Sequence, residues 1–141
     1  MTTPEGGSME AMEIAGGCHC GAVRYVIGGR PRRHSLCFCA DCRRCAGAPV
    51  VAWAVVDEGM LRVSGEVSVY RSSGDVERSF CPRCGAGLFY RSQKLFPGSV
   101  DVQTGTFDDP EILPPTEAIQ MAEAPSWMAG IGELPKHWRW P

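Results

Sequence analysis

The chain has 141 residues, 44% of them hydrophobic, and a formal net charge of −2. This length predicts a single domain with a modest core, and the weak charge gives no reason to expect general affinity for nucleic acid or for anionic membranes. The 17 glycines and 11 prolines favour many short strands and turns over long helices.

The first 15 residues are small, polar and aperiodic, and we expect residues 1–15 to be a flexible leader that precedes a domain over residues 16–127. They show no apolar stretch behind a basic start, so no secretory signal is predicted. No run approaches about 18 apolar residues, so no membrane-spanning helix is predicted either. We therefore expect a cytoplasmic protein whose thiols stay reduced.

Short β-prone runs alternate along the chain with turns that contain glycine. Strands are expected over residues 22–27, 33–38, 50–57, 60–63, 67–72, 76–80, 88–92 and 99–106. A short helix is expected over residues 41–46, ended by Gly47 and Pro49. Many short strands with few helices predict a mainly β domain.

From Asp108 onward the chain is rich in proline and in acidic residues. The C-terminal tail, residues 128–141, carries Trp138 and Trp140. Indole rings at such positions more often cover a hydrophobic edge than bind a ligand. We therefore expect the tail to pack on the domain.

The eight cysteines occur in closely spaced groups that lie tens of residues apart. These groups are Cys18 and Cys20, then Cys37, Cys39, Cys42 and Cys45, then Cys81 and Cys84. Two thiolates one or two residues apart can bind one ion at about 2.3 Å, while distant pairs close a long loop around it. Disulfides are the alternative in a secreted chain, but a reducing compartment favours thiolates that bind zinc.

The spacing suggests two ions. The first would be held by two matching pairs from distant strands, Cys18 with Cys20 and Cys81 with Cys84. The second would be held by three ligands within six residues, Cys37, Cys39 and Cys42. Cys45 could be a fourth ligand that closes the second site, or a spare that leaves one position for water or substrate. An iron–sulfur stretch partly matches Cys39-x2-Cys42-x2-Cys45, but no fourth cysteine precedes Pro49.

Basic residues gather around the middle cysteines, against the single acid Asp41. They are Arg24, Arg30, Arg32, Arg33, Arg43 and Arg44. They form either a solvated face or a basic rim that draws a carboxylate-bearing substrate toward the cysteines. The candidates to line a substrate cleft are Arg43, Arg44 and Trp53. His34 could assist the site or simply pack, and His19 should face away from the first ion.

The chain resembles the glutathione-dependent formaldehyde-activating (GFA) enzyme family, whose relatives include centromere protein V. The resemblance rests on Gly17-Cys18-His19-Cys20-Gly21, Cys37-x-Cys39-x2-Cys42-Arg43, Gly47-Ala48-Pro49, Phe80-Cys81-x2-Cys84-Gly85 and Gly105-Thr106-Phe107-Asp108-Asp109-Pro110. It covers roughly Ile14 to Trp127, and seven cysteines in register make it specific.

The resemblance implies the β-tent (Mss4-like) fold of small zinc-binding proteins, built of short antiparallel strands, and two zinc ions as cofactors. It implies a structural zinc on Cys18, Cys20, Cys81 and Cys84. It implies a catalytic zinc on Cys37, Cys39 and Cys42. Cys45 stands where the family more often carries a small residue, which leaves open whether it closes the second site.

Two functions follow from these expectations. The first is a zinc-dependent carbon–sulfur lyase-like enzyme that forms or cleaves adducts between a thiol such as glutathione and an aldehyde such as formaldehyde. Zinc is thiophilic, and a thiolate near neutral pH is the nucleophile that attacks a carbonyl carbon. The second is a non-catalytic, zinc-stabilised protein-binding module with two structural zinc sites, since fold alone does not fix function. A homodimer is compatible with either.

Overall fold

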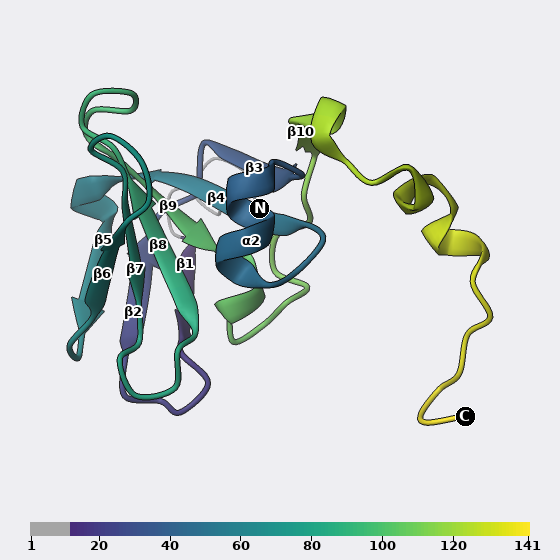
Figure 1. Cartoon of the computed structure of the whole chain (residues 1–141). Coiled ribbons are helices and arrows are strands. Elements are labelled where there is room, and N and C mark those ends of the chain that lie inside the picture. The colour runs from purple at the N-terminus through teal and green to yellow at the C-terminus, as the bar shows by residue number, and fades with distance from the viewer. Residues whose placement is uncertain (1–11) are drawn as a thin grey trace, which may run out of the picture.

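Two β-sheets enclose the main hydrophobic core in the computed structural model, which describes residues 12–141 (Figure 1). The smaller sheet has the order β1-β2-β5, with strands Glu13–Gly17 (β1), Arg24–Gly28 (β2) and Leu61–Ser64 (β5). The larger sheet has the order β10-β3-β4-β9-β8-β7-β6. Its strands are Glu117–Ile119 (β10), Arg33–Cys37 (β3), Val51–Asp57 (β4), Ser99–Gln103 (β9), Gly87–Arg91 (β8), Glu77–Phe80 (β7) and Ser68–Arg71 (β6). Neighbouring strands are antiparallel, except that β10 and β3 are parallel.

The main core forms where the inward faces of the two sheets meet. In β2, Tyr25 and Ile27 are buried while Arg24 is exposed, as expected for a strand with one face on a core. The Tyr25 ring contacts Phe89 of β8 edge to face, with ring centroids 5.5 Å apart. Apolar burial of this kind is the dominant stabilising term in folding, and here it joins the two sheets.

A second apolar cluster lies on the opposite face of the larger sheet. Ala54 belongs to the main core and its neighbour Trp53 to the second cluster, because successive side chains of a strand point to opposite faces. The second cluster consists of Cys37, Cys42, Val51 and Trp53. The cross-strand pair of Cys37 and Val51 places one of these cysteines on that outer face.

One short helix, α2 (Ala40–Ala46), covers part of the outer face (Figure 1). Its N-cap is Cys39, whose sulfur accepts a hydrogen bond from the backbone N–H of Cys42, and it ends at Gly47 in a left-handed conformation with φ 65°. The predicted helix and its glycine end are therefore confirmed. The 3-10 helices are Glu58–Met60 (η1), Thr104–Thr106 (η2), Met121–Glu123 (η3) and Ser126–Glu133 (η4).

The predicted fold class is confirmed, because the chain is mainly β and has the β-tent architecture of short, mostly antiparallel strands. Strand β10 was not expected from the sequence, and its three residues take strand form by pairing with β3. The last expected strand, residues 99–106, is shorter in the structure and turns into η2 after Gln103. No helix among the described residues is long and apolar enough to cross a membrane.

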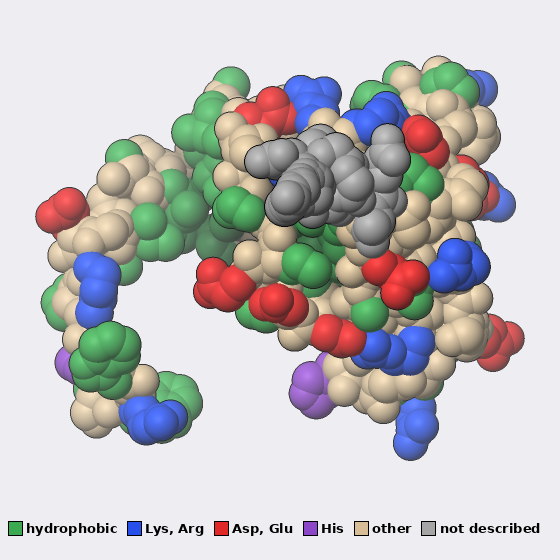
Figure 2. Space-filling view, turned by 180° about the vertical axis from the view of Figure 1, so that it is seen from behind, with side chains coloured by type: hydrophobic (Ala, Val, Ile, Leu, Met, Phe, Trp, Pro, Cys, Tyr) green, Lys and Arg blue, Asp and Glu red, His purple; other side chains and the backbone are tan. Residues whose placement is uncertain are grey.

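Both ends of the chain differ from expectation. The expected leader reached residue 15, but β1 begins at Glu13, and residues 1–11 lie outside the described part of the chain. The C-terminal tail leaves the domain in Figure 1, and Figure 2 shows hydrophobic side chains exposed along it. Trp138 and Trp140 are 103% and 94% exposed, so the expected packing of the tail is wrong for this structure. Beyond Pro125, the backbone hydrogen bonds from Met128 to Pro125 and from Leu134 to Ile131 are local turns that do not tie the tail to a strand.

A carboxyl group on β9 should make the stability of the fold depend on pH. Burial raises the pKa of Asp101 to about 6, against the opposing charges of Arg32 and Arg33. The folded state therefore holds this proton more tightly than the unfolded chain, so the stabilisation is complete below pH about 4 and is lost as pH rises through about 6. We expect Asp101→Asn to raise the free energy of unfolding at pH 8 by about 2 kcal/mol.

Urea unfolding from pH 5 to pH 8 measures this effect, and the gain should grow across that interval. Glu66→Gln is the matched control, since it also removes one carboxylate but from an exposed side chain. A gain that is independent of pH, or one that the control reproduces, would contradict the assignment of the effect to burial of Asp101.

Candidate functional site

The first cysteine group joins two loops that come from different sheets. The sulfur atoms of this group lie within 4.8 Å of one another; its members are Cys18, Cys20, Cys81 and Cys84. Cys18 follows β1 and Cys81 follows β7, and the Cys20 sulfur lies 3.7 Å from that of Cys81. Four sulfur atoms that bind the same zinc ion tetrahedrally at about 2.3 Å lie about 3.8 Å from one another. The observed spacing therefore fits a closed four-sulfur site.

Backbone turns hold the sulfur atoms of the first group. The N–H groups of Val23 and Arg83 donate to the sulfur atoms of Cys18 and Cys81 at 3.2 and 3.3 Å. Each loop also contains a glycine that follows its second cysteine, Gly21 or Gly85, with φ 83° in both cases. Glycine adopts this conformation without the strain that a side chain would bring, which explains the Cys-Gly step in both loops.

The second cysteine group lies at the junction of β3 and α2 on the outer face of the larger sheet. It consists of Cys37, Cys39 and Cys42, whose sulfur atoms also lie within 4.8 Å of one another. Burial raises the pKa of Cys37 to about 12, so this thiol stays neutral until a cation arrives. Metal binding at this group would therefore release protons.

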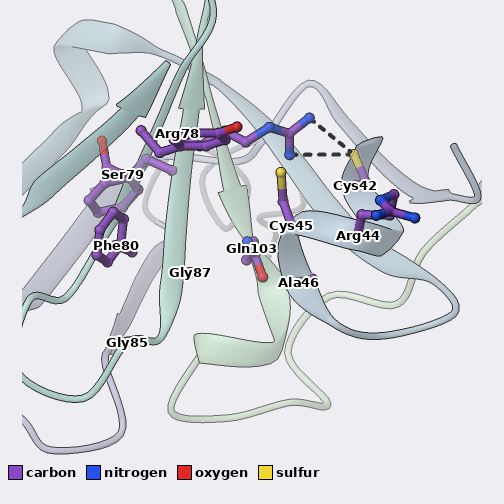
Figure 3. A pocket seen from close by; sticks show the side chains of 12 residues that line it. Cys42, Arg44, Cys45, Ala46, Arg78, Ser79, Phe80, Gly85, Gly87 and Gln103 are labelled. Atoms are coloured by element: carbon purple, nitrogen blue, oxygen red, sulfur yellow. Dashed lines mark hydrogen bonds between the residues drawn. The ribbon is translucent and has the colours of Figure 1, made fainter. Parts of the chain in front are cut away.

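Cys45 lies outside the second group. It is exposed and lines a cavity of about 580 Å³ next to Cys42. The cavity wall also contains Arg44 from α2, Arg78 from β7 and Gln103 from β9 (Figure 3). None of the described residues that form this wall is acidic, so its formal charge is positive.

The structure places the three predicted cleft residues differently from one another. Arg44 lines the cavity next to Cys42. Arg43 points elsewhere: it lines a shallow hollow with Trp127, and its Nε atom is buried without a hydrogen-bond partner. Trp53 is 5% exposed and packs behind Cys37 and Cys42, so it is a supporting side chain instead of a rim residue.

Three of the six arginines in the predicted basic cluster form ion pairs. Arg24 pairs with Asp108 at 2.5 Å, and Arg32 pairs with Asp57 at 3.1 Å. Arg33 likewise pairs with an acid, Glu117 of β10. These three arginines form ion pairs on the solvated surface, and they do not form a rim around the cysteines.

Neither cysteine group includes a histidine among the described residues. His34 is buried, and its Nε2 atom lies 2.9 Å from the hydroxyl of Thr104. Burial lowers its pKa, so the neutral imidazole is favoured. His34 pairs with Ala54 across β3 and β4, which places it on the core face, opposite Cys37. His19 is exposed, as expected for a residue between two cysteines of an extended loop.

Sequence reasoning missed Arg78. Both Nη atoms of its guanidinium lie 3.8 Å from the Cys42 sulfur (Figure 3). Arg78 is far from the middle cysteines in sequence, and the strand order β3-β4-β9-β8-β7 of the larger sheet brings it to them. Strand alternation would place Arg78 on the same face as Phe80, but it could not show that this face meets Cys42.

The family model for the glutathione-dependent formaldehyde-activating enzyme matches residues 13–123. A protein of Halomonas elongata that carries a provisional name as such an enzyme is 32% identical over 127 residues, which are 83% of this chain and 80% of that protein. An uncharacterized lyase of Schizosaccharomyces pombe is 30% identical over 78 residues, which are 55% of this chain and 57% of that lyase.

A crystal structure of a Rhodobacter sphaeroides protein has the same fold, with a TM-score of 0.57 and 24% identity. It covers 74% of this chain and 98% of the Rhodobacter chain. The match of the family model over most of the chain agrees with the two cysteine groups and the β-tent fold. The chain therefore belongs to the glutathione-dependent formaldehyde-activating enzyme family.

Proposed function

We propose that the chain is a zinc-dependent enzyme of the carbon–sulfur lyase type. It would form or cleave adducts between a thiol, glutathione or a similar molecule, and a small aldehyde such as formaldehyde. The observation that carries the proposal is the three-sulfur group whose Cys42 stands in the wall of a cationic cavity. Family membership supports the same chemistry.

The donor sets support a different role for each zinc. Four sulfur atoms fill a tetrahedral coordination shell, so the first group would hold a structural ion. Three sulfur atoms leave one position open, so the second group would hold a catalytic one. When bound there, zinc would supply a thiophilic Lewis acid that favours the thiolate form of a substrate thiol.

The residues of the chain around the second group would orient the thiol and keep water away. Trp53 and Tyr90 pack edge to face behind the sulfur atoms, with ring centroids 5.8 Å apart. They close one side of the group, so a substrate would reach it from the cavity. Arg44 and Arg78 on the cavity wall would attract a carboxylate-bearing thiol, since opposite charges interact strongly in a partly enclosed site.

The alternative function is a non-catalytic protein-binding module in which both zinc sites are structural. The exposed indoles of Trp138 and Trp140 favour it, because exposed aromatic side chains are common at protein interfaces. Such a module would be expected to close its second site with a fourth ligand. The position of Cys45 outside the second group favours the enzyme.

Metal content and reaction rate together test the proposal. Protein purified without added metal should contain two zinc ions per chain, one with four sulfur ligands and one with three by X-ray absorption. NMR exchange spectroscopy should show faster formation and breakdown of the hemithioacetal of glutathione and formaldehyde than in buffer alone. Two four-sulfur sites with no rate enhancement would favour the module and reject the enzyme.

A further inference from the structure

The Arg78 guanidinium is fixed by three contacts next to the second cysteine group. Its Nε atom donates to the Ser72 hydroxyl at 3.0 Å, and its Cζ atom lies 5.1 Å from the centroid of the Tyr90 ring. Its two Nη atoms face the Cys42 sulfur at 3.8 Å (Figure 3). Stacking on an aromatic ring leaves the edge of the guanidinium free to donate hydrogen bonds, so its orientation is set before a ligand arrives.

The charge of Arg78 has no carboxylate partner within the described part of the chain. The ion pairs of that part use other arginines, and Arg78 is partly buried. A partly buried cation needs an anion or strong acceptors, because its desolvation is costly. A contact of 3.8 Å to a single sulfur is a weak one, and a guanidinium has five N–H donors. Arg78 therefore retains donors for an anionic group in the cavity.

We propose that Arg78 is the specificity-determining residue of the cavity and that it selects thiols carrying a negative charge near sulfur. The proposal rests on the function proposed above, which places the reacting thiol beside Cys42. A group that binds the Nη atoms must then lie within a few ångströms of that thiol. A planar guanidinium matches a carboxylate with two parallel hydrogen bonds, whereas a neutral or cationic thiol has no carboxylate to accept them. Arg44, on the same wall, adds a second positive charge.

Three small thiols that differ in charge test the proposal on the zinc-loaded protein without aldehyde. Thioglycolate is anionic, 2-mercaptoethanol is neutral, and cysteamine is cationic. Isothermal titration under anaerobic conditions gives the affinity of each thiol for the wild-type protein and for Arg78→Met. Each thiol is compared with itself between the two proteins, so differences in thiol acidity cancel. We expect Arg78→Met to weaken thioglycolate binding about 10- to 100-fold, as for the loss of a charged hydrogen bond. Binding of 2-mercaptoethanol should stay unchanged.

Two further variants separate charge selection from a purely structural role. Arg78→Lys keeps the charge and should keep part of the preference for thioglycolate, even if Arg78→Met loses its second zinc. Arg30→Met removes the same charge from an exposed side chain outside the cavity and should change nothing. An equal loss of affinity for all three thiols in a variant that keeps both zinc ions would show that Arg78 only positions Cys42, and would overturn the proposal. Unchanged affinity for thioglycolate would overturn it as well.

The role of Arg78 and the proposed enzymatic function can be rejected independently of each other. If the protein prefers anionic thiols through Arg78 but does not accelerate adduct formation, the specificity role stands and the enzymatic function falls. If adduct formation is accelerated with no preference for charge, the function stands and the role of Arg78 is rejected.

Discussion

Replacement of Cys81 by serine should unfold the chain or leave it insoluble. The Cys81 side chain is completely buried, and its sulfur belongs to the first cysteine group, which ties the loop after β7 to the loop after β1. A structural zinc site contributes on the order of 10 kcal/mol to folding, which is comparable to the whole stability of a small domain. The loss of one ligand also leaves a polar hydroxyl in an apolar position.

Zinc content and circular dichroism melting curves of Cys81→Ser measure this effect, and a strong chelator should reproduce it in the wild-type protein. The matched control is Cys45→Ser, which replaces an exposed cysteine outside both groups. A soluble Cys81→Ser variant with a Tm within a few degrees of the control would refute a structural ion at the first group.

The sequence predicted the grouping of the cysteines well, because each loop is local. Cys18-x-Cys20-Gly21 and Cys81-x2-Cys84-Gly85 each place two sulfur atoms within a single turn, so spacing shows the members of each pair. The two pairs come from distant loops and meet in the fold. The short helix after Cys39 followed in the same way from its glycine end. Such features depend only on residues that are close in the chain, so a pattern of a few residues is enough to predict them.

The parts that the sequence missed depend on long-range strand pairing. Strand β10 has only three residues and is held by its contacts with the β3 segment. The backbone N–H of Phe38 donates to the Ile119 carbonyl, and the Ser35 hydroxyl donates to the Glu117 carboxylate. Arg78 reaches the second cysteine group only through the order of the larger sheet. Neither strand order nor the choice of outward face follows from alternation in one strand. Sequence proximity left open whether the arginines form a solvated face or a basic rim, because it does not report the ion pairs that neutralise Arg24 and Arg32.

Replacement of Cys39 by serine should remove the second zinc and the catalytic activity while the domain stays folded. Cys39 caps α2 through its sulfur, and serine is itself a favoured helix cap, so the helix should persist. The second group lies on the outer face of the larger sheet, apart from the main core, so its loss should cost only about 1–3 kcal/mol of stability. Metal analysis should show one zinc per chain in place of two, with hemithioacetal exchange reduced to the rate in buffer.

The variant Cys45→Ser shows whether the ion that is lost in Cys39→Ser has three sulfur ligands or four. Cys45 lies three residues after Cys42 on the same short helix, but its sulfur is outside the second group. If the second ion has three sulfur ligands and an open position, Cys45→Ser should keep both ions and most of the activity, because an open coordination position is what a substrate thiol needs. If Cys45→Ser loses the second ion as Cys39→Ser does, Cys45 is a fourth ligand. The site is then closed, no thiol can reach the ion, and the binding-module function replaces the enzymatic one.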